Sequence, residues 1–152
     1  MNPTIRRIDE HEVDLVAPLF DAYRQFYSQP ADLERAREFL HRRIERNESV
    51  VLIAEFDGIA AGFTQLFPMF SSVRTARIWV LNDLYVAADA RRRGTARALL
   101  DAAAQFARDD GAARIVLETG RDNTAARALY RAAGWAEEET QWYALSLVPQ
   151  DR

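Results

Sequence analysis

Residues 88–100 read ADARRRGTARALL, in which three arginines lead into Gly94 and a helix-forming sequence follows. The first turn of a helix has backbone N–H groups without partners and carries the positive end of the helix dipole. Arginines placed there oppose the dipole at a cost of roughly a few tenths of a kcal/mol each. Gly94 allows close backbone approach and Thr95 and Ala96 keep the turn small, so the stretch predicts a polyanion site. The alternative is a solvated turn whose arginines point into water.

The sequence around this stretch predicts a strand, a loop and a helix in succession. Residues 75–86, TARIWVLNDLYV, have the apolar character of a central strand. The helix over 94–110 has an apolar face and ends at Gly111, a residue suited to a C-terminal cap. A strand that enters a helix through a short loop is a common setting for phosphate binding. The three glycines of a dinucleotide fingerprint and the lysine of a P-loop are both missing.

The rest of the chain completes an α/β pattern. Apolar periodicity and turn residues predict strands over 4–8, 49–56, 60–67 and 113–119, helices over 10–27, 31–46 and 123–133, and a final hairpin of two strands from Trp135 onward. Asp57-Gly58 predicts a hairpin turn. The predicted order is β-α-α-β-β-β-α-β-α-β-β, an α/β fold with a central mixed sheet flanked by helices. Without repeats or linkers, residues 1–152 are expected to form a single domain.

Composition removes several classes of function. The 152 residues carry a net charge of −3, which argues against nucleic acid or an anionic membrane as partner. Cysteine is absent and all 20 basic residues are arginine, which excludes disulfides, cysteine nucleophiles and Schiff-base lysines. His11 and His41 have no ligand-like spacing, so no metal site is expected. Without a signal peptide or a long apolar run, a cytoplasmic location is expected.

Two motifs together resemble one family. RRRGTA is similar to the R/Q-x-x-G-x-G/A signature of the GNAT superfamily of N-acetyltransferases, with Arg91, Gly94 and Ala96 at the defining positions. Residues 123–135, NTAARALYRAAGW, resemble the family pattern N-x-x-A-x-x-x-Y-x-x-x-G-[FW]. The matching residues are Asn123, Ala126, Tyr130, Gly134 and Trp135. The predicted element order is also the family's, and the small single-domain polyamine and histone-type branch is most similar in character.

The resemblance implies a binding site for acetyl-coenzyme A (acetyl-CoA). In the family the loop binds the pyrophosphate through backbone amides, and a strand spread apart at a bulge pairs with the pantetheine arm. The implied cofactor-binding residues are Leu84, Tyr85, Val86, Arg91, Arg92, Arg93, Gly94, Thr95, Ala96, Asn123, Ala126 and Tyr130. Because the family often dimerises, a homodimer is expected.

The implied activity is transfer of an acetyl group from acetyl-CoA to a primary amine. Amide formation from a thioester requires a neutral amine, a route for its proton and an acid for the departing thiolate. With no lysine or cysteine available, direct attack by the amine in a ternary complex is the simplest mechanism. Tyr130 is the candidate acid, since a helical projection places it at the edge of the sheet-facing side. The alternative for Tyr130 is an ordinary half-buried aromatic that packs under the next strand.

Candidate acceptor residues fall in two segments. Asn82 and Asp83 interrupt an apolar strand, and adjacent residues point to opposite faces unless a bulge changes which. One of the pair should therefore face the acceptor, and Asp83 is a candidate catalytic residue or the source of a structural hydrogen bond. The polyamine branch reads Leu-Glu-Asp here, so this chain lacks one carboxylate. The resemblance also places Tyr23 and Tyr27 beside the acceptor, where core packing is the alternative.

Two other readings remain open. The first is a non-catalytic sensor that binds acyl-CoA without acceptor chemistry, and the second is a nucleic-acid module that uses ARRRGTAR as a basic patch. The acceptor itself is left as a small amine, a polyamine, an amino acid derivative or a protein lysine. Residues 137–139 are three glutamates expected in a solvated turn, where they could also attract a cationic acceptor.

Overall fold

The computed structural model describes residues 2–149. Its strands and helices alternate along the chain in an α/β order. In chain order they are β1 Thr4–Arg7, a 3-10 helix Glu10–Leu15, α1 Ala17–Phe26, α2 Leu33–Glu45, β2 Val50–Phe56, β3 Ile59–Ser71, β4 Ala76–Val86, a 3-10 turn Ala88–Ala90, α3 Thr95–Asp109, β5 Arg114–Val116 and α4 Thr124–Ala132.

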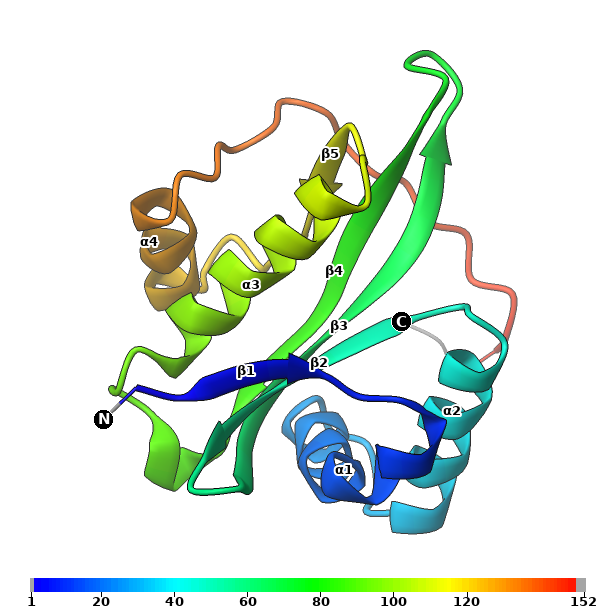
Figure 1. The fold of residues 1–152 in the computed structure, drawn as a ribbon. Helices are drawn as coiled ribbons and strands as arrows, with labels where there is room; N and C mark the ends of the chain where they lie inside the picture. The colour runs from blue at the N-terminus through cyan, green and yellow to red at the C-terminus, as the bar shows by residue number, and fades with distance from the viewer. Residues whose placement is uncertain (1, 150–152) are drawn as a thin grey trace.

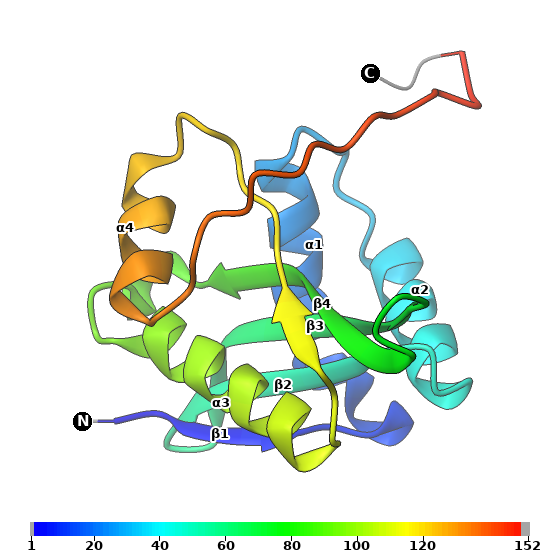
Figure 2. The ribbon, with the colours of Figure 1, turned by 90° about the horizontal axis from the view of Figure 1, so that it is seen from above.

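The five strands form one mixed sheet in the order β1-β2-β3-β4-β5. The first three pairs are antiparallel and the β4–β5 pair is parallel. Helices α1 and α2 lie on one side of the sheet and α3 on the other (Figure 1), a layering also visible from above (Figure 2). One apolar core lies under α1 and α2, and a second lies between the sheet and α3. The predicted α/β class with a mixed sheet between helices is confirmed.

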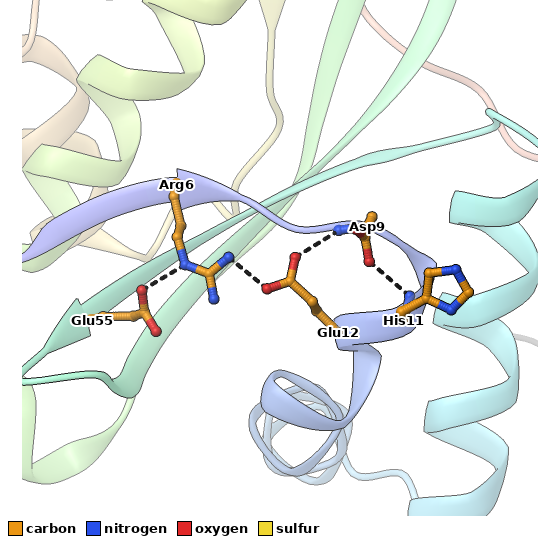
Figure 3. A network of polar contacts seen from close by, with 5 residues as sticks. All are labelled: Arg6, Asp9, His11, Glu12 and Glu55. Carbon is orange, nitrogen blue, oxygen red and sulfur yellow. Dashed lines mark hydrogen bonds and ion pairs between the residues drawn. The ribbon is translucent and has the colours of Figure 1, made fainter.

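Polar contacts fix the first strand to its neighbours. The Arg6 guanidinium contacts Glu55 of β2 at 2.8 Å and Glu12 of the first 3-10 helix at 2.6 Å. At the start of that 3-10 helix, the Asp9 carboxylate accepts from His11 N at 2.8 Å and the Glu12 carboxylate accepts from Asp9 N at 3.2 Å (Figure 3). The network therefore sets the direction in which the chain leaves β1 toward α1.

Two predicted boundaries were wrong for local reasons. The single helix expected over 10–27 divides into the 3-10 helix and α1, because Pro18 lies in the first turn of α1 and has no N–H to donate to a longer helix. The strand expected to end near Pro68 continues to Ser71. Beyond Leu66, β3 no longer pairs with β2, so the missing N–H of Pro68 lies on an open edge where proline is tolerated.

A bulge in β4 divides the strand between the two sides of the sheet. Gln65 pairs with Asp83 and Leu66 pairs with Leu81, so Asn82 has no partner in β3. Before the bulge, Trp79 and Leu81 pack in the core on the α3 side. After it, Leu84 and Val86 take that side, while Tyr85 packs toward α1. The extra residue therefore turns Asp83 toward α1, as the side chain period of two requires.

The two strands predicted at the C-terminus are absent from residues 135–149, which run as irregular chain and extend away from the sheet (Figure 2). The sequence pattern behind that prediction is real, because Tyr143, Leu145 and Leu147 alternate with smaller residues. All three side chains are exposed, Tyr143 at 91%. A strand needs a partner for its backbone, and within this chain the segment pairs with none of the described strands.

Candidate functional site

Two cavities adjoin β4, one at the bulge and one beyond the C-terminal end of the strand. The acceptor cavity, as we name it, has a volume of about 270 Å³. Its lining comes from α1, α2, β3, β4 and the α1–α2 connection: Phe20, Tyr23, Arg24, Tyr27, Gln29, Phe39, Gln65, Phe67, Asn82 and Asp83. The loop cavity, also of about 270 Å³, lies at the start of α3. Its lining residues are Val86, Ala90, Arg91, Arg92, Gly94, Thr95, Ala96, Arg97 and Leu129.

The Asp83 carboxylate is a buried acid in the acceptor cavity, with 4% of its surface exposed. Gln65 Nε2 donates to Asp83 Oδ2 at 2.5 Å, and Asn82 Nδ2 donates to Asp83 Oδ1 at 2.9 Å. Burial raises the pKa of Asp83, and these hydrogen bonds oppose that rise without cancelling it. Asp83 is therefore easier to protonate than an exposed aspartate.

Tyrosines surround this carboxylate. The Tyr23 hydroxyl donates to the Asn82 carbonyl at 3.3 Å, and its pKa is raised, first by burial and then by the Asp83 charge. The ring of Tyr23 packs edge to face against Tyr27 at 5.1 Å and against Tyr85 at 6.1 Å. Tyr23 and Tyr27 thus form an aromatic wall of the cavity, and the raised pKa of Tyr23 keeps its hydroxyl protonated at neutral pH.

The start of α3 leaves backbone donors open to a ligand. Gly94 is the N-cap residue, with a φ of 76°, and offers no side chain to the first turn. The first helical bond runs from Ala98 N to Gly94 O, so the amides of residues 95–97 have no acceptor inside the helix. Thr95, Ala96 and Arg97 all line the loop cavity, so these amides lie beside open space. Such a group of amides fits a phosphate.

The three arginines have different surroundings. Arg91 Nε donates to the carbonyl of Val86 at 3.0 Å, which ties the loop to the end of β4. The guanidinium of Arg93 lies over the ring of Phe56 at 5.4 Å. Arg92 has a φ of 65°, a left-handed conformation that costs a residue other than glycine roughly 1–2 kcal/mol. Only Arg91 and Arg92 line the loop cavity, and the strain at Arg92 fits a site under functional constraint.

The sheet opens next to the loop cavity. The pairing of β4 with β5 ends at Val80 and Val116. Beyond that point, residues 81–86 of β4 have no neighbour on the β5 side among the described strands. An extended ligand with amide groups could therefore pair with this edge as an added strand does.

Tyr130 lies on α4, half-buried against the core on the α3 side. Its ring is 6.4 Å from that of Trp135. Burial raises the pKa of Tyr130, and so does the neighbouring Tyr27, which lines the acceptor cavity. The hydroxyl therefore stays protonated at neutral pH.

The structure brings most of the residues predicted from sequence to these cavities. Tyr23, Tyr27, Asn82 and Asp83 line the acceptor cavity. Val86, Arg91, Arg92, Gly94, Thr95 and Ala96 line the loop cavity. The predicted residues outside both linings are Leu84, Tyr85, Arg93, Asn123, Ala126 and Tyr130. The Asn123 side chain caps α4 by accepting from Ala126 N at 3.3 Å. All the assigned roles remain predictions.

Sequence reasoning missed three polar residues of the acceptor cavity, which are Arg24, Gln29 and Gln65. Gln65 holds Asp83, and its signal was a polar side chain within the apolar run FTQLF of β3. Arg24 lies one position after Tyr23, and nothing in the periodicity of α1 distinguished it from a surface arginine. Whether the side chains of Gln65 and Arg24 reach the cavity depends on which strand packs opposite them, and a single sequence does not show this.

Metal-binding clusters and membrane-spanning helices are both absent from residues 2–149. No three histidine, aspartate or glutamate side chains there are grouped so as to hold a metal ion. None of the helices in that range is both long and apolar enough to cross a membrane.

The comparisons with known proteins agree with this arrangement. Residues 16–135 match the acetyltransferase (GNAT) family. An uncharacterised N-acetyltransferase of Bacillus subtilis strain 168, YhfO, is 46% identical over 134 residues, which cover 88% of this chain and 90% of YhfO. A probable acetyltransferase of Haemophilus influenzae is 34% identical and covers 76% of this chain and 80% of its own.

A solved structure shows the same fold. The crystal structure of a probable acetyltransferase superposes with a TM-score of 0.90 at 40% identity, over 95% of this chain and 98% of that one. The fold and the two cavities define an acyl-transfer protein of the GNAT type. The chain belongs to the GNAT family of acetyltransferases and is a GNAT superfamily N-acetyltransferase.

The raised pKa of Asp83 gives a pH-dependent contribution to stability. Because the folded state holds the proton more tightly than the unfolded chain, this contribution is complete below the ordinary value of 3.8 and is lost as pH rises through the raised pKa. The free energy of unfolding of wild type minus that of Asp83→Asn should therefore fall as pH rises from 3.8. Urea unfolding at a series of pH values measures it, and Asp89→Asn, at an exposed site, should show no such fall. A difference that grows with pH would contradict the burial of Asp83.

Proposed function

We propose that the protein transfers an acetyl group from acetyl-CoA to a primary amine by direct attack in a ternary complex. The observation that carries the proposal is that β4 contributes to both cavities: Asn82 and Asp83 line the acceptor cavity, and Val86 at the end of the strand lines the loop cavity. Acetyl-CoA supplies the thioester: the amine nitrogen bonds to the carbonyl carbon, the carbon–sulfur bond breaks, and the thiolate leaves.

The loop cavity fits the pyrophosphate of acetyl-CoA. The amides of residues 95–97 would donate to its oxygens, and Arg92 would add positive charge beside them. Arg91 would act indirectly, because its hydrogen bond to Val86 holds the loop against β4. The open edge of β4 over residues 81–86 would pair with the amides of the pantetheine arm.

Tyr130 and Asp83 would handle the two protons. The raised pKa of Tyr130 keeps its hydroxyl protonated, so it can donate to the departing thiolate. Asp83, whose raised pKa lies closer to that of an amine, would accept the proton that the amine loses. Tyr23 and Tyr27, which form the aromatic wall of the cavity, would position the amine between Tyr130 and Asp83.

We also propose that the protein is a homodimer in which residues 140–149 contact a second copy. Trp142, Tyr143, Leu145 and Leu147 are all exposed by 77–91% within one chain, although they are mostly large and apolar. A contiguous exposed apolar segment marks an interaction surface. The outer edge of β5 has no strand beside it among the described residues, and the alternating pattern of the segment suits a strand. The cytoplasmic location and the single-domain organisation stay predictions.

Gly94→Glu should abolish binding of acetyl-CoA. The new side chain places bulk and negative charge in front of the amides of the first turn of α3, at a left-handed φ that glutamate adopts poorly. Thermal unfolding with and without acetyl-CoA measures the effect, and we expect the stabilisation by the ligand to disappear.

Gly111→Glu is the matched control for that substitution. Gly111 has a φ of 79° and equally open surroundings, and it lies at the other end of α3. It should lose about the same stability and keep the ligand-induced rise in melting temperature. An undiminished rise in Gly94→Glu would mean that the pyrophosphate binds elsewhere.

Tyr130→Phe should lower kcat by about 100-fold or more, the scale of general acid catalysis, and leave the affinity for acetyl-CoA nearly unchanged. Release of free thiol measures turnover, and the thermal shift measures binding. Tyr143→Phe, at an exposed tyrosine, is the control. Equal turnover in Tyr130→Phe and wild type would rule out the acid role.

Leu145→Asp combined with Trp142→Asp should convert the dimer into a monomer, because charge replaces the apolar contact. Light scattering on a sizing column measures the molecular mass. Wild type should have twice the mass of one chain, and the variant should have the mass of one chain. Ile59→Asp, at an exposed apolar residue in the β2–β3 hairpin, should remain dimeric. A monomeric wild type at high concentration would exclude this interface.

A further inference from the structure

The acceptor cavity contains two side chains of opposite charge that do not pair with each other. Asp83 and Arg24 both line it. In the described part of the chain, no carboxylate lies within the 4.0 Å ion-pair distance of Arg24. The other lining residues are neutral, and five of the ten are phenylalanine or tyrosine. The cavity is thus an aromatic space with one acid and one base.

Folding contacts do not account for the position of Arg24. Its Nη1 atom is buried and has no hydrogen-bond partner among residues 2–149. Asp21 on the same helix does not take it, because its two carboxylate oxygens accept from Asp32 N at 2.9 Å and from Gln25 Nε2 at 3.3 Å. A charged donor buried without a partner destabilises the fold by roughly 1–3 kcal/mol or more. A bound anion would satisfy this donor.

We propose that the amine acceptor also carries a carboxylate, as an amino acid does, and that Arg24 binds this carboxylate while Asp83 faces the amine. The inference rests on the proposed function, since it names the substrate class of the same site. Arginine suits the role because its planar guanidinium can donate two parallel hydrogen bonds to one carboxylate. The positive charge of Arg24 disfavours acceptors such as diamines, because one of their ammonium groups would face the guanidinium.

Matched pairs of acceptors test the inference. Putrescine and ornithine, cadaverine and lysine, and phenethylamine and phenylalanine each differ by one carboxylate. For wild type we expect kcat/KM to be at least about tenfold higher for the member with the carboxylate, since a site built for a hydrogen-bonding group rejects analogues that lack it. Thiol release measures the rates.

Arg24→Met keeps the length of the side chain and removes the charge. The ratio of kcat/KM between the two members of each pair should fall by about tenfold or more, to near one, and Arg24→Lys should restore part of it. Arg35→Met, at an exposed arginine of α2, should keep the wild-type ratio. A ratio near one in wild type, or an Arg24→Met variant that loses both members equally, would overturn the inference.

A binding measurement separates this inference from the proposed function. Phenylalanine, ornithine and lysine are added to protein saturated with coenzyme A, and the melting temperature is followed. A rise in wild type that is lost in Arg24→Met supports the carboxylate site even if no amine is acetylated, an outcome that would refute the transferase proposal alone. No rise with any amino acid, together with turnover of the simple amines, would refute the carboxylate site alone.

Discussion

The extra residue at Asn82 is the constraint on which the arrangement of the site depends. In a regular strand, residues 79, 81, 83 and 85 would all face the same side. The bulge keeps Trp79 and Leu81 against α3 and turns Asp83 and Tyr85 toward α1. The same strand therefore contributes to both cavities, and a polar acid reaches the acceptor side without interrupting the apolar packing under α3.

The bulge also explains why a buried acid is tolerated there. Gln65 directly opposite and Asn82 adjacent each donate to one carboxylate oxygen. Thr64 Oγ1 donates to the Asp83 carbonyl at 2.7 Å, so the backbone at this point is also satisfied. A buried acid without such donors would cost several kcal/mol and would be expected to move toward solvent. The hydrogen bonds hold the carboxylate in place, and burial raises its pKa.

The fold was largely predictable because its elements are local. The hairpin at Asp57-Gly58 formed as expected, with both residues at positive φ. The start of α3 also lies where the glycine predicted it, within one residue. Features that depend on a neighbouring strand or helix were harder to predict from the sequence. The bulge was foreseen as a possibility, but its consequence for Asp83 depends on the register with β3. Arg24 and Gln65 enter the site only through tertiary packing, and the C-terminal strands were wrongly predicted because none of the described strands pairs with that segment.

The arginines of the loop show how one motif can serve two purposes. The sequence suggested that all three oppose the helix dipole and await an anion. In the structure, Arg91 is hydrogen-bonded to Val86 and Arg93 is stacked on Phe56, so both contribute to the shape of the loop. Of the three, Arg92 lines the cavity without either contact, beside the backbone amides of the first turn of α3. Arg92 adopts a strained, left-handed backbone conformation that suits glycine. The loop therefore has this conformation and also has a positive side chain at that position. The anion site is therefore built mainly from backbone geometry, and side-chain charge supplements it.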